Sequence, residues 1–406
     1  MAEPADDAAD GIGELTLAQV AAVAGVSPAT VRRWLDRGLV PGFEGRWTPS
    51  ALAYVRVIAR LRARGHSLED IKQASDSGQL AIGPIENLLS AAGPRHSLRH
   101  ASRESGLDVE LIKRIYATMG LGAPPSDGIG DEDLQMIRYA ASVLDAGFPL
   151  AAFLQLMRVY GQTIAQIADA EVRLIHLYVH EPLMRAGVPN VEIAEEMEGL
   201  AREVFPFAAP FMNYLHGRLL AQFVEQDMIG HMESDLGEAE LEEGRLRVAI
   251  AFADLAGYAR LTVERGDEAA VGAVERFAAA VTQTLPVDAR VIKTLGDEVM
   301  VIGADPGALT AWAVGLQRGI APGEPPPRIG VHYGEVLYRD GDYFGREVNQ
   351  AARVVARAGG GEVLVTRPVV EMAAGLDGII FNRIGEVRLK GFSEPSELFI
   401  ASTPEG

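Results

Sequence analysis

Apolar residues in the first half of the chain recur every three or four positions, which predicts helices. Thr16 and Gln19 have the spacing of a capping box at the start of one helix. Ser27 followed by Pro28 is typical of the start of a second helix, because serine caps the first turn and proline fits the first helical position. Residues 14–76 are therefore predicted to form short helices joined by tight turns.

An internal repeat extends this prediction. Residues 96–156 follow the pattern of residues 14–76 with a shift of 81, which becomes 82 after one inserted residue. The shift aligns glycines at expected turns: Gly25 with Gly106, Gly38 with Gly120, and Gly65 with Gly147. We therefore expect two similar helical units in tandem, joined by a linker at residues 77–95.

Residues 157–231 also show helical periodicity, in a stripe that includes Tyr160 and Ile164. Such a stripe suits either the core of a helical bundle or a helix that pairs with a second chain, and the spacing alone does not separate the two. A further amphipathic helical stretch is predicted to begin at Phe211, just after Pro210. We expect this region to be a helical regulatory or dimerisation segment.

The pattern changes after an acidic run at residues 232–244, which is predicted to be a linker or a transmitting helix. Residues 245–402 then alternate strand and helix signals. The run RLRVAIAFADL is typical of a strand, and a Gly-Asp pair between two strand-like runs indicates a hairpin. Helices are expected at 267–284 and 306–319. This part of the chain is predicted to be one α+β domain.

Composition narrows the class of protein. The net charge of −19 argues against a chain that binds nucleic acid along its whole length. Residues 14–76 are modestly basic, with nine Lys/Arg against six Asp/Glu, whereas residues 1–13 are predicted to be a disordered acidic tail. The absence of cysteine excludes disulfides, thiolate metal sites and cysteine nucleophiles. Because no segment looks like a signal peptide or a membrane span, we expect a soluble, cytoplasmic protein with no membrane partner.

Three short strings in residues 245–402 carry the candidate chemistry: FADLAGY at 252–258, KTLGD at 293–297 and DYFGREVNQAAR at 342–353. Each string alone is ordinary, because strands often end in Asp and helices often have a polar face. Together they resemble the catalytic domain of class III nucleotidyl cyclases. The resemblance implies a multidomain chain with an all-α N-terminal half and an α+β, ferredoxin-like catalytic domain that converts ATP to 3′,5′-cyclic AMP and pyrophosphate.

The resemblance also implies roles for single residues. Asp254 and Asp297 match the family's two metal aspartates and imply two divalent cations, Mg²⁺ or Mn²⁺, because hard cations prefer carboxylate oxygens. Lys293 and Asp342 match the pair that reads the base: the lysine faces adenine N1 and the aspartate faces the exocyclic amine, which selects ATP. A guanylate cyclase normally carries Glu and a small residue there, so guanylate specificity is the less favoured alternative.

Asn349 and Arg353 lie four residues apart, on one face of a predicted helix. The resemblance makes Asn349 a group that orients the ribose, and Arg353 the cation that meets charge developing on the phosphate. In the family, the metal aspartates come from one subunit and the remaining groups from the other. Because this chain has both sets, the resemblance implies a head-to-tail homodimer that is obligate for activity, with two equivalent sites.

The string LAQVAAVAGVSPATVRRWLDRGLV, within residues 14–76, resembles the MerR-type helix-turn-helix. That resemblance implies a DNA major-groove contact by Arg32 and Arg33. The short GFEGRW segment stands where the family has a longer wing, and the tandem units favour a protein scaffold instead. The alternative to a regulated cyclase is therefore a MerR-like DNA-binding regulator that uses the cyclase domain as a nucleotide sensor. Residues 157–231 are also similar to the helical regulatory segments of soluble bacterial cyclases, which implies autoregulation of the enzyme.

Overall fold

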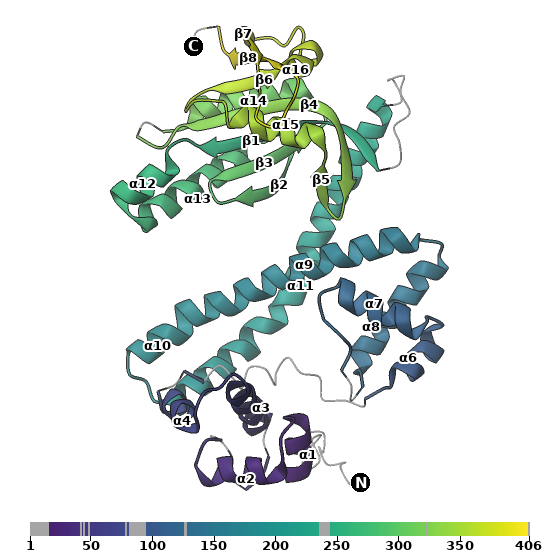
Figure 1. Cartoon of the computed structure of the whole chain (residues 1–406), viewed down its shortest axis with the longest axis vertical. Coiled ribbons are helices and arrows are strands. Elements are labelled where there is room, and N and C mark those ends of the chain that lie inside the picture. Colours follow the sequence, from purple (N-terminus) through teal and green to yellow (C-terminus); the bar gives the residue numbers. More distant parts are fainter. Residues whose placement is uncertain are drawn as a thin grey trace, which may run out of the picture. The chain divides into compact units, whose positions relative to one another are not determined.

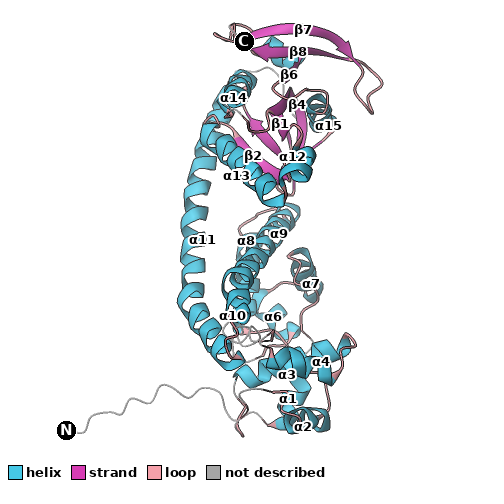
Figure 2. Ribbon diagram, turned by 90° about the vertical axis from the view of Figure 1, so that its left-hand side faces the viewer, coloured by secondary structure: helices cyan, strands magenta, loops and turns pink. Residues whose placement is uncertain are grey.

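The computed structural model describes residues 16–40, 43, 45–47, 49–77, 79–80, 95–125, 128–234, 244–321 and 323–404. The chain divides into two compact units, Met1–Leu219 and Leu220–Gly406. The first unit is helical where it is described, and the strands belong to the second (Figure 2). The predicted tail at residues 1–13 and most of the predicted linkers at 77–95 and 232–244 lie outside the described residues.

The helices of the first unit follow one another along the chain with few described residues between them. They are α1 (Leu17–Val23), α2 (Pro28–Asp36), α3 (Pro49–Ala63), α4 (Leu68–Asp76), α6 (Leu98–Ser105), α7 (Val109–Thr118), α8 (Asp131–Asp145), α9 (Leu150–Ile175), the π-helix η1 (His176–His180), α10 (Glu181–Arg185) and α11 (Asn190–Ser234). Thr16 and Gln19 form the predicted capping box of α1, and the Ser27 side chain accepts the backbone N–H of Thr30 in α2. These caps satisfy N–H groups that have no partner within the helix.

The order of helices repeats along the first unit. α6 and α7 start 81 residues after α1 and α2, and α8 and α9 start 82 residues after α3 and α4. The aligned glycines all have positive φ: Gly25 (67°), Gly38 (62°), Gly65 (95°), Gly106 (75°), Gly120 (79°) and Gly147 (93°). Each set has its own core, around Trp34 in the first and around Ile112 in the second. The helices therefore repeat at the shift found in the sequence.

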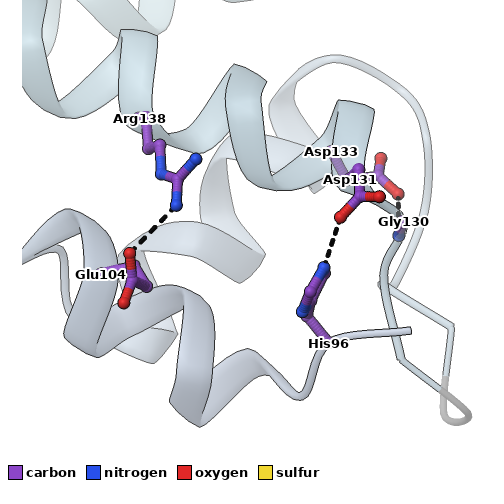
Figure 3. Close-up of polar contacts among 6 residues, drawn as sticks. All are labelled: His96, Glu104, Gly130, Asp131, Asp133 and Arg138. Atoms are coloured by element: carbon purple, nitrogen blue, oxygen red, sulfur yellow. Dashed lines mark hydrogen bonds and ion pairs between the residues drawn. The ribbon is translucent and has the colours of Figure 1, made fainter. Parts of the chain in front are cut away.

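Polar contacts close the second set of helices around the start of α8 (Figure 3). Arg138 in α8 donates to Glu104 in α6 at 3.0 Å. His96 Nε2, just before α6, lies 2.6 Å from Asp131 Oδ1 at the first position of α8. Asp133 accepts the backbone N–H of Gly130 at 2.9 Å. The acidic first turn of α8 thus accepts a backbone hydrogen bond at the start of that helix and holds the segment just before α6.

The long helix α11 runs without a break through Pro206 and Pro210. The prediction of a separate stretch that begins at Phe211 is therefore wrong, because Phe211 lies inside the helix. A proline removes one internal hydrogen bond and kinks a helix, but flanking turns can carry the helix past it. Although α11 has 45 residues, neither it nor any other described helix has a stretch long and apolar enough to cross a membrane.

The second unit is built on a mixed sheet (Figure 1). Its strands are β1 (Arg245–Leu255), β2 (Arg290–Leu295), β3 (Glu298–Gly303), β4 (Pro327–Arg339), β5 (Asp342–Phe344), β6 (Val363–Thr366), β7 (Ile380–Val387) and β8 (Ser396–Ser402). The order is β2-β3-β1-β4-β6-β8-β7, with β5 paired to β4; in the part of the chain that the structure describes, β4 and β6 are the only neighbours that pair in parallel. The helices between the strands are α12 (Tyr258–Arg265), α13 (Asp267–Thr284), α14 (Pro306–Gly319), α15 (Arg346–Val355) and α16 (Arg367–Met372).

Helices cover both faces of this sheet. On one face, Ala251 of β1 lies in a core with Phe277 of α13 and Trp312 of α14. On the other face, Phe252 lies in a core with residues of β5 and α15. The predicted strand face of Val248, Ile250 and Phe252 is buried as expected, whereas Leu246, assigned to the same face, is 41% exposed. The face covered by α15 is the one to which Asp254 belongs.

Candidate active site

Two aspartates lie close together where the end of β1 contacts the turn between β2 and β3. Asp254 is the penultimate residue of β1 and shares a strand face with Phe252, because alternate residues of a strand point the same way. Asp297 follows Gly296, whose φ of 66° is a left-handed conformation that glycine adopts at little cost. The backbone N–H of Leu255 donates to the carbonyl oxygen of Asp297 at 3.3 Å. This bond ties the turn to the end of β1.

Negative charge is concentrated at this corner of the sheet. Burial raises the pKa of Asp297, and the neighbouring Asp254 carboxylate raises it further. Burial raises the pKa of Glu298 as well, with added repulsion from the two aspartates. Arg328 offsets part of this charge, since its Nε and Nη2 donate to Asp254 Oδ2 at 3.0 and 2.5 Å. Adjacent, partly desolvated carboxylates form the kind of oxygen-rich site that suits hard divalent cations.

The sequence patterns do not single out Arg328. It is the second residue of β4, and it reaches the site because β4 pairs with β1 so that Arg328 lies opposite Asp254. The strings that suggested the other residues are local, whereas this contact joins positions 74 residues apart. Only the pairing of the two strands reveals it.

Lys293 and Asp342 form a second polar pair. Lys293 Nζ donates to Asp342 Oδ2 at 2.5 Å, and the two side chains are 33% and 29% exposed. Asp342 Oδ1 accepts the backbone N–H of Tyr343 at 2.8 Å, which fixes the carboxylate at the start of β5. The structure therefore brings these two residues together, and their contact with a base stays a prediction.

Asn349 and Arg353 lie one turn apart on the outer face of α15, and both are exposed. Ala351 and Val355, on the inner face, lie in the core beneath the helix. Among the described residues, no hydrogen bond or ion pair engages the side chain of Asn349 or Arg353, or joins the aspartate pair to the Lys293–Asp342 pair. The predicted residues thus form two pairs and one exposed helix face.

A buried network anchors the start of α15. His332 of β4 is only 2% exposed; its Nδ1 lies 2.8 Å from Thr366 Oγ1 and its Nε2 lies 2.5 Å from Glu347 Oε2. The hydrogen bond from His332 lowers the pKa of Glu347, and the charge of Arg346 lowers it slightly further. Because Glu347 precedes Asn349 by two residues, this network positions the helix that presents the candidate residues.

Replacing Glu347 with Gln should lower the free energy of unfolding by about 1 kcal/mol near neutral pH, because it removes the charge from this hydrogen bond but keeps the shape. The lowered pKa means that the folded protein keeps the carboxylate ionised to a lower pH than the unfolded chain does. The contribution is complete above about pH 4.3, the ordinary Glu value, and is lost as pH falls through the folded value.

Urea unfolding of the wild type and of Glu347→Gln between about pH 7 and 4 measures this difference. It should stay constant down to about pH 5 and shrink below that. Glu264→Gln is the matched control, because Glu264 is exposed and lies 3.7 Å from Arg260 in a surface ion pair that should contribute little. A difference that grows on acidification would contradict the assignment.

Arg32 and Arg33 belong to the other unit. Both side chains are exposed on α2, whose buried face carries Val31 and Trp34. Exposure on one helix leaves the predicted DNA contact a prediction.

Comparison with known proteins identifies the family. A model described as "Adenylate cyclase regulatory domain" matches residues 38–222, and one described as "Adenylate and Guanylate cyclase catalytic domain" matches residues 327–402. An uncharacterised protein of Mycobacterium tuberculosis is 29% identical over 82% of this chain and 86% of its own length. The adenylate cyclase of Streptomyces griseus is 30% identical over 74% of this chain and 73% of its own length. The chain belongs to the adenylate cyclase family. Among solved structures, the adenylyl cyclase CyaB from P. aeruginosa aligns with 40% of this chain and 96% of its own, at 22% identity and a TM-score of 0.34.

The cyclase therefore has a regulatory domain before a class III catalytic domain. The catalytic model covers Asp342, Asn349 and Arg353, and it begins one residue before Arg328. Asp254 and Asp297 lie before the matched segment, so their place in the site rests on the geometry at the end of β1. The regulatory model begins in the first helical unit and ends in α11.

Proposed function

We propose that this adenylate cyclase converts ATP to 3′,5′-cyclic AMP and pyrophosphate at sites shared by two copies of the chain. The observation that carries the proposal is the meeting of Asp254 and Asp297 at one partly buried corner. A separate Lys293–Asp342 pair supports it, since β2 and β5 supply a donor and an acceptor for a base.

In this reaction the ribose 3′ oxygen forms a bond to the α-phosphorus. The bond from that phosphorus to the bridging oxygen breaks, pyrophosphate leaves with the electron pair, and the hydroxyl proton is released. The carboxylates of Asp254 and Asp297 fit two divalent cations, Mg²⁺ or Mn²⁺, which supply positive charge for the triphosphate and for the attacking oxygen. Arg328 would add a cation on the same side, and Arg353 would meet the charge that develops on the phosphate. Asn349 would orient the ribose.

Base choice would rest on the Lys293–Asp342 pair. Adenine presents an acceptor at N1 and a donor at its exocyclic amine, which match the lysine and the aspartate. Guanine presents a donor and an acceptor at these positions in the opposite order. The two side chains are hydrogen-bonded to each other at 2.5 Å. A base must therefore separate them and offer a new hydrogen-bond partner to each. Adenine can do this, because its N1 accepts from the lysine and its exocyclic amine donates to the aspartate.

A second copy of the chain would complete each site. The exposed side chains of Asn349 and Arg353 face outward on α15, as expected if they act on a nucleotide held by the aspartates of a partner. The regulatory half also offers a surface for pairing, because α11 has a long series of exposed apolar side chains, among them Val204, Phe207, Phe211, Tyr214 and Leu219. A series of this length is typical of an interface. Control by the helical half would then act through the geometry of the dimer.

Purified full-length protein with ATP and either Mg²⁺ or Mn²⁺ should form 3′,5′-cyclic AMP, with kcat/KM for ATP at least about tenfold above that for GTP. Product identification by chromatography and initial rates with both nucleotides test this. A preference for GTP would favour the guanylate alternative. Binding of ATP with no product under either metal would favour the nucleotide-sensing regulator and overturn the proposal.

A further inference from the structure

The last turns of α11, within the second unit, contact the strand that carries Lys293. The guanidinium carbon of Arg290, the first residue of β2, lies 5.7 Å from the ring centroid of Phe223 in α11 and 5.8 Å from that of Tyr343 in β5. Nη2 of Arg290 also donates to the Tyr343 hydroxyl. A planar cation that contacts two rings is a directional contact, so it restrains the spacing of the three elements.

A bulge in β2 gives Arg290 and Lys293 the same orientation. Residues three apart in a regular strand point to opposite faces. Here the register shifts between Val291 and Lys293, so that Arg290 pairs with Ile302 and Lys293 pairs with Met300. Because Ile302 and Met300 are two residues apart and lie in one core, Arg290 and Lys293 share the face to which Tyr343 belongs. Bulges near active sites commonly redirect a side chain in this way.

The contact continues through β5 to the other half of the base-reading pair. Tyr343 is 2% exposed and lies in the core beneath α15, so its ring has little freedom. Its backbone N–H donates to Asp342, which in turn accepts from Lys293. Two contacts thus join β2 to β5: Arg290 bonds to Tyr343, and Lys293 bonds to Asp342.

A second bond holds α11 against the same segment. Gln226, one turn after Phe223, donates its side-chain amide to the carbonyl oxygen of Val287, three residues before Arg290. The helix therefore contacts the entry to β2 at two points. A rotation or shift of α11 must move Arg290 or break both contacts.

We propose that Arg290 is a positioning residue for base recognition, clamped by Phe223 and Tyr343, and that the position of α11 thereby sets the affinity and selectivity for adenine. The inference rests on the proposed role of Lys293 and Asp342. None of the three clamp residues touches the nucleotide in this proposal. They hold β2 and β5 at the spacing that the base-reading pair requires.

Phe223→Ala and Arg290→Lys in the full-length protein test the clamp. The lysine keeps a cation but loses the planar group that contacts both rings. Each variant should raise KM for ATP about 3- to 30-fold, which corresponds to the usual strength of a cation–π contact. kcat should change by less than about twofold, because the contact is the same in ground and transition states. The preference for ATP over GTP should fall, and equilibrium binding of ATP, which needs no turnover, should weaken by a similar factor.

Three comparisons separate positioning from a general loss of structure. Phe223→Tyr keeps the ring and should restore wild-type KM. Val224→Ala, at a neighbouring position that is 57% exposed, should leave KM unchanged. The Mn²⁺ concentration for half-maximal activity should also be unchanged, because Asp254 and Asp297 lie outside the clamp.

Unchanged KM and ATP binding in both clamp variants would overturn the inference, as would equal effects in Val224→Ala or a parallel loss of kcat and Mn²⁺ affinity. Failure of the proposed function is a different result, because the wild type itself would then form no cyclic AMP.

Discussion

Replacing Asp297 with Ala, or Asp254 with Asn, should lower the rate of cyclic AMP formation on the order of 10³-fold or more. Both carboxylates lie at one corner, where burial and the neighbouring Asp254 carboxylate raise the pKa of Asp297 and so disfavour its ionised form. A divalent cation held by Asp254 and Asp297 would relieve the repulsion between them and would supply positive charge for the triphosphate. Loss of either carboxylate would remove a proposed cation ligand from this corner. Initial rates of the full-length variants at saturating ATP and Mn²⁺ measure the effect.

Two variants distinguish loss of a cation ligand from loss of the fold. Asp254→Asn keeps an oxygen that can accept from Arg328, so the contact between β1 and β4 should survive. Asp377→Ala, at an exposed position outside the site, should keep wild-type activity. If Asp297→Ala retained more than about a tenth of the wild-type rate at saturating metal, the cost would be under ~1.4 kcal/mol, too small for a cation ligand.

The candidate site residues could be selected from the sequence because each lies in a short string with its own local geometry. Gly296 and Asp297 indicate a hairpin turn, and the spacing of Asn349 and Arg353 indicates one helix face. These signals come from neighbouring residues, so they do not depend on how the strands pair. The structure places Asp254 next to Asp297 and Lys293 next to Asp342, and the roles of these residues stay predictions.

Contacts that depend on strand pairing could not be predicted from the sequence. Arg328 reaches Asp254 only through the register of β4 against β1. The bulge that turns Lys293 toward the face of Arg290 leaves no Gly or Pro in β2 to mark it. His332 and Glu347 meet because α15 packs on β4. These features depend on how strands pair and on how α15 packs against the sheet, and no short run of sequence marks them.

In the helical half, too, local signals could be predicted from the sequence, whereas features that depend on tertiary contacts could not. Caps at Thr16 and Ser27 and the glycines of the repeat are local signals, and they placed the helices correctly. The expected break at Pro210 did not occur, because tertiary contacts and flanking turns can outweigh one lost backbone hydrogen bond. As a result α11 is one helix that extends from the regulatory match into the second unit.

Mixing two inactive variants should restore activity if each site is shared between chains. Arg353→Ala alone should lower the rate about 10²- to 10³-fold, because it removes the cation proposed to meet charge in the transition state. It leaves Asp254 and Asp297 intact, whereas Asp297→Ala leaves Asn349 and Arg353 intact. In an equal mixture half of the dimers contain one chain of each kind, and each of these has one complete site. The mixture should therefore reach about a quarter of the wild-type rate.

The matched control is a mixture of Asp297→Ala with Asp254→Asn. Both lesions then lie in the same half of the site, so no arrangement of the two chains yields a complete site and the rate should stay at the level of the single variants. Co-expression with two different affinity tags allows the mixed dimers to be isolated and assayed directly. A site contained in one chain would give no restoration in either mixture, because every chain would still lack one of its own groups. Restoration in the first mixture alone would show that the aspartates of one copy act with the α15 residues of the other.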